Sequence, residues 1–270
     1  MNDAKYIERP GGDKLAYRVQ GDGPPLLLIM GIGSRSIDWT DDLLGLLDSS
    51  FQCIMYDHRG VGLSDMPTAS VSLSSMADDA MAVLDEVGVD SCDVLGYSMG
   101  GMIAQRVALN HASRVKRLAL ISTTSGSPGD IQPSPEIIQK LTEQGPSERE
   151  TMVNAMAAFS APGIRDRAPA RFDTFINKAL TQPTSLPTMM SQYTAVVSDL
   201  ERHTLLGNIK VPTMVLTGDA DPLVPTGNSA ILHEMISASK LIYIENCGHM
   251  VCIEQPERFA EEIKRFFPLS

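Results

Sequence analysis

The chain has 270 residues, of which 43% are hydrophobic, and it carries a formal net charge of −11 at pH 7. This length accommodates one large α/β domain or two small ones, with a sizeable buried core. The 22 Lys and Arg residues form no long run, so the composition argues against nucleic acid or an anionic membrane surface as a partner. The polar N-terminal segment lacks the apolar run of a signal peptide, and we therefore expect a cytoplasmic protein.

Strand and helix signals alternate along most of the sequence. Short apolar segments predict eight strands, at residues 6–10, 15–19, 25–30, 51–56, 92–95, 117–121, 212–217 and 241–244. Helical periodicity predicts helices at residues 36–47, 73–87, 99–110, 227–236 and 256–267. A glycine pair, Gly11-Gly12, predicts a hairpin between the first two strands. The alternation that follows predicts an α/β fold with a mostly parallel eight-stranded sheet and helices on both faces.

The alternation is interrupted after the sixth predicted strand. Residues from about 126 to 207 read as helices and loops punctuated by proline, and they include several methionines. We therefore expect a helical cap at residues 127–207, inserted into a core domain formed by residues 1–126 and 208–270. The flexible methionines suit an apolar wall for small or medium acyl groups, although packing within the cap explains at least half of them.

The segment LGYSMGG at residues 95–101 joins a predicted strand directly to a predicted helix. Such an abrupt turn holds the residue at its tip in strained backbone geometry. Gly96 and Gly100 remove side chains that would collide there, so Ser98 is exposed at the carboxyl end of the sheet. This G-x-S-x-G pattern predicts a nucleophile elbow. The alternative, a phosphate-binding turn, lacks the G-x-G-x-x-G spacing and a following lysine.

A serine nucleophile needs a base, and the chain has five histidines. His249 follows the last predicted strand, at the sheet edge where α/β proteins carry their sites. The other four fit structural roles in a turn, at a helix end, in the cap and within a helix: His58, His111, His203 and His233. An orienting carboxylate is expected from Asp221 rather than Asp219, because Pro222 holds the residue before it extended and starts a turn.

Two backbone N–H groups are predicted to stabilise negative charge beside Ser98. The Met99 N–H lies at the start of the helix that follows, where backbone donors and the helix dipole favour an anion. The second donor is expected from the loop after the strand at 25–30, where the Ile32 N–H fits best. The alternative interpretation of that loop is an ordinary glycine-rich turn between a strand and a helix.

Together these segments resemble the α/β-hydrolase superfamily over nearly the whole chain. The motifs that carry the resemblance are MGIG at 30–33, DHRGVGLS at 57–64, GYSMGG at 96–101, GDAD at 218–221 with VP at 224–225, and GH at 248–249. The resemblance implies nucleophile, acid and base roles for Ser98, Asp221 and His249, and a cap in the insertion. Many relatives carry His-Gly where this chain has Met30-Gly31, which changes the polarity beside the expected donor. A serine nucleophile disfavours the dehalogenases and epoxide hydrolases, which use aspartate.

The resulting hypothesis is a serine hydrolase that cleaves small to medium, largely apolar carboxylic esters or lactones through an acyl-serine intermediate, without a cofactor. Carbon–carbon bond hydrolysis and cofactor-free perhydrolysis would use the same residues. A capped ligand receptor with little turnover is the alternative of another class. The segment CGHMVC at 247–252 is not expected to bind a metal, because no second ligand cluster matches structural-zinc spacing, and all four cysteines are expected to be free and buried.

Overall fold

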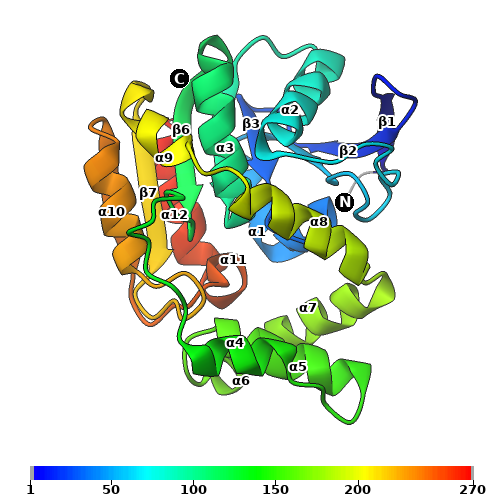
Figure 1. Ribbon diagram of the computed structural model, residues 1–270, viewed down its shortest axis with the longest axis vertical. Helices are drawn as coiled ribbons and strands as arrows, with labels where there is room; N and C mark the ends of the chain where they lie inside the picture. Colours follow the sequence, from blue (N-terminus) through cyan, green and yellow to red (C-terminus); the bar gives the residue numbers. More distant parts are fainter. Residues whose placement is uncertain (1–2, 269–270) are drawn as a thin grey trace.

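A single eight-stranded sheet organises the computed structural model, which describes residues 3–268 (Figure 1). The strands are β1 (Lys5–Glu8), β2 (Lys14–Gln20), β3 (Pro25–Ile29), β4 (Gln52–Tyr56), β5 (Cys92–Tyr97), β6 (Val115–Ile121), β7 (Thr213–Gly218) and β8 (Ser239–Ile244). Their order across the sheet is β1-β2-β4-β3-β5-β6-β7-β8. Only the pairings of β2 with β1 and β4 are antiparallel among the described strands. The predicted fold class and the hairpin between the first two strands are confirmed.

Helices cover both faces of the sheet, as the buried runs of the central strands require. One face carries α1 (Asp41–Leu47) and α12 (Pro256–Phe266), and the other carries α2 (Leu73–Val87), α3 (Met99–Asn110) and α10 (Gly227–Met235). Alternate residues of β3 point to opposite sides, so Leu28 packs in the first apolar cluster and Leu27 in the second. Within residues 3–268, no helix is both long enough and apolar enough to cross a bilayer.

The helix predicted at 36–47 is wrong as a single element. The chain instead forms a short 3₁₀ helix, η1 (Ser36–Trp39), followed by α1, and Thr40 between them has a φ of 58°. The Thr40 hydroxyl accepts a hydrogen bond from the Leu43 N–H at 3.2 Å, so this residue caps a new helix instead of continuing the old one. The segment therefore changes direction at Thr40, a local break that apolar periodicity does not reveal.

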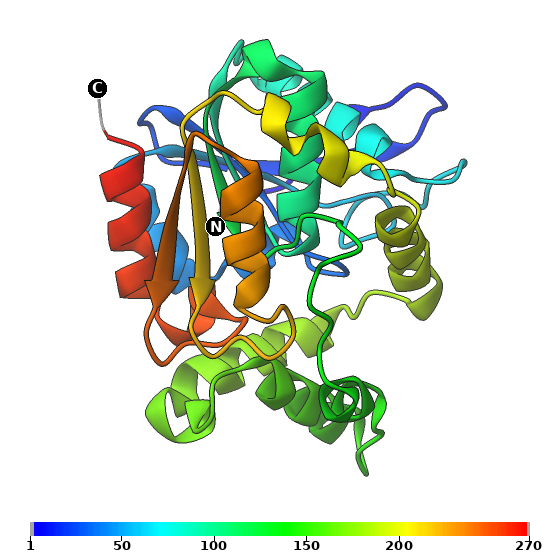
Figure 2. The same ribbon diagram turned by 60° about the vertical axis from the view of Figure 1, so that its left-hand side comes forward.

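The insertion between β6 and β7 is helical. It contains α4 (Pro135–Thr142), α5 (Glu148–Phe159), α6 (Ile164–Arg167), α7 (Pro169–Thr181), α8 (Leu186–Val197) and α9 (Arg202–Leu205), followed by the 3₁₀ helix η3 (Leu206–Asn208). Figure 2 shows the arrowheads of β7 and β8 directed toward its green helices, so part of the insertion lies at the carboxyl end of the sheet. A helical insertion after the sixth strand is thus confirmed, while its exact domain boundaries stay a prediction.

The four cysteines are free and buried, as expected from the sequence. Burial raises the pKa of Cys53, Cys92 and Cys252 to about 12, and it also raises the pKa of Cys247. The thiols are therefore protonated near neutral pH and behave as small apolar side chains in the core.

Candidate active site

Ser98 lies at a sharp turn between β5 and α3. Its backbone has a φ of 56° and a ψ of −122°, a strained conformation for a residue with a side chain. A Cβ atom at Gly96 would overlap the Gly100 carbonyl, and one at Gly100 would overlap the Ile29 carbonyl of the neighbouring strand. The turn therefore closes only because both positions lack side chains.

The adjacent strand holds this turn in place. The Ser98 N–H donates to the Ile121 carbonyl at the end of β6 at 2.8 Å, and the Ser98 carbonyl accepts from the Thr123 hydroxyl at 2.7 Å. Met99 begins α3, and its backbone N–H donates to no acceptor within residues 3–268. A free N–H at a helix start beside a partly exposed hydroxyl is suited to bind developing negative charge.

His249 and Asp221 form a buried pair across two loops. His249 Nδ1 lies 2.8 Å from Asp221 Oδ2, and both side chains are almost fully excluded from solvent. The other carboxylate oxygen, Oδ1, accepts the backbone N–H groups of Leu223 at 3.0 Å and Val224 at 2.8 Å. Both carboxylate oxygens thus have fixed partners, and Oδ2 requires a hydrogen on His249 Nδ1, which leaves Nε2 available as a base.

Asp219, the competing carboxylate, lies outside this pair. It is exposed and accepts the Cys247 N–H at 3.3 Å, a contact between the loops that follow β7 and β8.

The loop at residues 245–250, the histidine loop, is held by hydrogen bonds to the insertion and to the sheet. The His249 N–H donates to the Phe159 carbonyl of the insertion at 2.8 Å, and the His249 carbonyl accepts from the Tyr97 hydroxyl of β5 at 2.9 Å. The Tyr97 ring lies 5.2 Å from the His249 ring, centroid to centroid. The two hydrogen bonds hold the main chain of His249, and the ring contact restricts its imidazole without using either ring nitrogen.

Glu254 is a buried carboxylate at the histidine loop that the sequence analysis missed. It accepts the Gly248 N–H at 3.1 Å and the Met250 N–H at 3.3 Å, on either side of His249, and also the Ala161 N–H of the insertion at 3.0 Å. Burial raises the pKa of the Glu254 carboxyl, and the three N–H donors oppose that shift. Its sequence signal was a single glutamate ending the apolar run VCIE, within the short helix α11 (Val251–Glu254).

Ser98 and His249 line one cavity of about 800 Å³ between the sheet and the insertion. Its walls are mainly apolar and include Ile32, Met30, Met152, Met156, Phe159, Phe175, Leu180, Met189, Leu223 and Met250. A volume of this size suits a small organic molecule. The structure therefore brings Ser98, His249 and Ile32 to one cavity, and Asp221 contacts the imidazole of His249.

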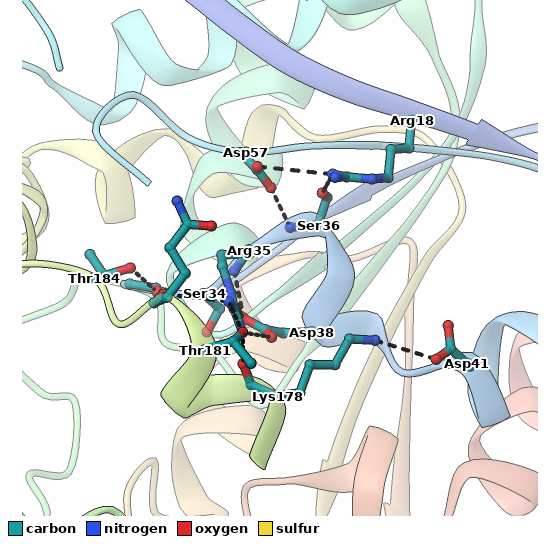
Figure 3. A network of polar contacts seen from close by, with 12 residues as sticks. Arg18, Ser34, Arg35, Ser36, Asp38, Asp41, Asp57, Lys178, Thr181 and Thr184 are labelled. Atoms are coloured by element: carbon teal, nitrogen blue, oxygen red, sulfur yellow. Dashed lines mark hydrogen bonds and ion pairs between the residues drawn. The ribbon is translucent and has the colours of Figure 1, made fainter. Parts of the chain in front are cut away.

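The loop that contains Ile32 joins β3 to η1. Its Ile32 N–H donates to no acceptor within the described part of the chain. The following residue, Gly33, has a φ of 66° and is bonded to the insertion through both its N–H and its carbonyl. Figure 3 shows the neighbouring part of this loop, where Arg35 meets Asp38 and the end of α7 at Lys178 and Thr181.

The other four histidines, all within residues 3–268, do not line the cavity. His58 Nε2 donates to the Met30 carbonyl at 2.9 Å, His111 pairs with Asp78, and His233 contacts Ser239. These contacts agree with the structural roles expected for them. The Nδ1 atoms of His58 and of the insertion residue His203 are buried without a hydrogen-bond partner among the described residues.

His58 is expected to make the protein sensitive to acid. Burial lowers the pKa of His58, so below the ordinary histidine value of about 6.5 the unfolded chain binds a proton that the folded chain does not. The free energy of unfolding should therefore fall as pH drops below about 6.5, with this one group contributing at most about 1.4 kcal/mol per pH unit. Urea unfolding of the wild type and His58→Gln from pH 7.5 to 5 measures the difference. An equal pH slope in both proteins would contradict the expectation.

The chain belongs to the α/β hydrolase fold family, whose family model matches residues 24–256. Its relatives include proteins named "Putative carbamate hydrolase RutD". The one from Pseudomonas savastanoi is 30% identical, covering 91% of this chain and 94% of the relative, and the one from Azorhizobium caulinodans is 28% identical, covering 95% and 96%. A solved structure of a thermophilic esterase from Thermogutta terrifontis has a TM-score of 0.78 at 25% identity and covers 98% of each chain.

Proposed function

We propose that this protein is a serine hydrolase that cleaves neutral carboxylic esters or lactones through an acyl-serine intermediate. The observation that carries the proposal is that Ser98 and the Asp221-bound His249 open into the same apolar cavity. Ser98, Asp221 and His249 would then be nucleophile, orienting acid and base, with the backbone N–H groups of Ile32 and Met99 as oxyanion donors. The cytoplasmic location expected from the sequence stays a prediction.

In the proposed reaction, Ser98 Oγ attacks the acyl carbon while its proton passes to His249 Nε2. The carbonyl oxygen becomes an oxyanion between the Ile32 and Met99 N–H groups. His249 returns the proton to the alkoxide as the ester C–O bond breaks, so an alcohol leaves, or a lactone ring opens. A water molecule, deprotonated by His249, then attacks the acyl-serine, and Ser98 recovers its proton as the carboxylic acid departs.

The cavity favours an uncharged substrate. Among its lining residues, Arg35 is the only lysine or arginine. Its guanidinium donates to Asp38 at 2.9 Å and to the Lys178 carbonyl at 2.7 Å, and it is almost fully buried. A substrate carboxylate would therefore lose its water without gaining a free cation, which is costly. This argues against acidic substrates, including diketo acids cleaved at a carbon–carbon bond.

Carbamate hydrolysis is a second candidate, favoured by the relatives that carry that name. A carbamate presents the same carbonyl to Ser98, and the intermediate would be a carbamoyl-serine. The two candidates differ in the acyl group transferred and use the same residues. Perhydrolysis, carbon–carbon hydrolysis and ligand reception remain distinguishable by product analysis and by turnover number.

The test is release of p-nitrophenol by the wild type from p-nitrophenyl esters of two to twelve acyl carbons, and from an N-alkyl carbamate of matched length. We expect kcat/KM to peak at a medium acyl chain and to be at least about tenfold lower for the anionic hemisuccinate than for the butyrate, because the succinyl carboxylate would be buried unpaired. Preference for the hemisuccinate would refute the neutral-substrate proposal. Absence of multiple turnover on every ester and carbamate would favour the receptor.

A further inference from the structure

The loop that carries the Ile32 N–H is held by the insertion. The Gly33 N–H donates to Gln192 Oε1 of α8 at 2.8 Å, and the Gly33 carbonyl accepts from the Thr184 hydroxyl at 2.6 Å. The Gly33 N–H belongs to the peptide plane that leaves Ile32. This plane and the plane of the Ile32 N–H meet at the Ile32 Cα, so holding the Gly33 peptide restricts the φ and ψ angles of Ile32, which orient the proposed oxyanion donor.

The burial of the Gln192 side chain costs free energy, because one of its polar atoms stays unpaired. Its side chain is 1% exposed, and its Nε2 is buried without a hydrogen-bond partner among the described residues. An apolar side chain of the same size would fill the space without leaving an amide donor unpaired. The bond to Gly33 is the one favourable polar contact of this side chain within residues 3–268.

A second tie joins the same loop to another helix of the insertion. Arg35 donates to the carbonyl of Lys178, in the last turn of α7, at 2.7 Å (Figure 3). It also donates to the carbonyl of Gln182, the residue after α7, at 3.4 Å. A buried cation there satisfies helix-terminal carbonyls and opposes the helix dipole. The loop is therefore bound by α7 through Arg35 and by α8 through Gly33.

We propose that Gln192 is a positioning residue for the loop at residues 30–35, the oxyanion loop. Through this residue, packing of α8 against the core orients the Ile32 N–H toward the oxyanion. This inference rests on the proposed function. Ser98 and Asp221 follow strands of the sheet, whereas the Ile32 donor depends on a bond from the insertion. A cavity with an undocked α8 would bind substrate and still stabilise the oxyanion poorly.

The test compares Gln192→Met, which keeps the packing and removes the acceptor, with Thr188→Val as matched control. Thr188 lies one turn earlier on α8, is equally buried, and bonds the Gly60 carbonyl at 3.4 Å instead of the oxyanion loop. An alkyl trifluoromethyl ketone, which forms a hemiketal oxyanion with a serine nucleophile, probes the hole. An ether of the same chain length probes the cavity alone, and hydrogen exchange at residues 31–35 reports the loop.

For Gln192→Met we expect kcat to fall about 10- to 100-fold, because the Ile32 N–H is displaced from the oxyanion rather than removed. Ki for the ketone should rise by the same factor. KM and Ki for the ether should stay within twofold, and exchange at 31–35 should accelerate. Thr188→Val should match the wild type in kcat, KM, both Ki values and hydrogen exchange. If Gln192→Met does not fold, Thr184→Val, which removes the other bond to Gly33, is expected to shift the same quantities in the same direction.

Two results would overturn the inference: unchanged ketone binding and kcat in folded Gln192→Met, or an equal loss of ketone and ether binding, which indicates general damage to the cavity. Failure of the proposed function looks different. In that case the wild type itself would form no ketone adduct at Ser98, and the positioning role would fall with it.

Discussion

Ser98→Ala is expected to lower kcat by about 10⁴-fold or more while KM changes little. The alanine removes the hydroxyl oxygen proposed to form the acyl bond. It leaves the strained turn intact, because that turn depends on Gly96, Gly100 and the bond from the Ser98 N–H to the Ile121 carbonyl. Steady-state hydrolysis of the best p-nitrophenyl ester measures the loss. Mass spectrometry after treatment with a fluorophosphonate should place the adduct on Ser98 in the wild type and find none in the variant.

Ser122→Ala is the matched control. Ser122 directly follows the neighbouring strand β6 and also has a positive φ, of 46°. Its buried hydroxyl has no partner among the described residues. It does not line the cavity. We expect its kcat to stay within about twofold of the wild type. Comparable losses in both variants would point to disturbance of the strand ends rather than to a nucleophile, and would contradict the assignment of Ser98.

Asp221→Asn should lower kcat nearly as much as Ser98→Ala, by about 10⁴-fold. The N–H groups of Leu223 and Val224 point at Asp221 Oδ1 and can only be satisfied by an oxygen. The amide nitrogen of asparagine must therefore occupy the Oδ2 position and donate to His249 Nδ1. That contact moves the imidazole hydrogen to Nε2, which can then no longer accept a proton from Ser98.

Asp219→Asn is the control for this substitution, because the Asp219 carboxylate is exposed and accepts the Cys247 N–H. Its kcat should remain within about twofold of the wild type. Retention of more than a tenth of the activity in Asp221→Asn would show that the tautomer of His249 is set by another group. Circular dichroism of both variants verifies that the comparison is between folded proteins.

The insertion contacts the proposed catalytic machinery at two separate loops. At the histidine loop, the Phe159 carbonyl accepts the His249 N–H, and Glu254 bonds the Ala161 N–H while lying 3.7 Å from Arg167. At the oxyanion loop, Gln192 bonds Gly33. The same segment that walls the cavity thus also orders groups expected to act on the substrate. Substitutions in the insertion should therefore alter kcat as well as substrate preference.

The sequence by itself determined the elements whose physical cause is local. Burial periodicity marks the strands and helices, and the two glycines around Ser98 follow from steric collisions within a few residues of the turn. Asp221 was predicted as the orienting carboxylate from Pro222, which directly follows it, and this signal is also local. Where a local feature left no periodic signal, as at Thr40, the predicted helix was wrong.

Only the tertiary structure decided how distant loops meet. The 2.8 Å contact of His249 with Asp221, the shared cavity, the support of the histidine loop by Glu254, and the bond from Gln192 to a residue 159 positions away all depend on the packing of the insertion against the sheet. A buried glutamine or glutamate in a sequence does not identify its partner. The partner is set by three-dimensional proximity, because burying a polar group is costly unless the packing brings a hydrogen-bond partner close to it.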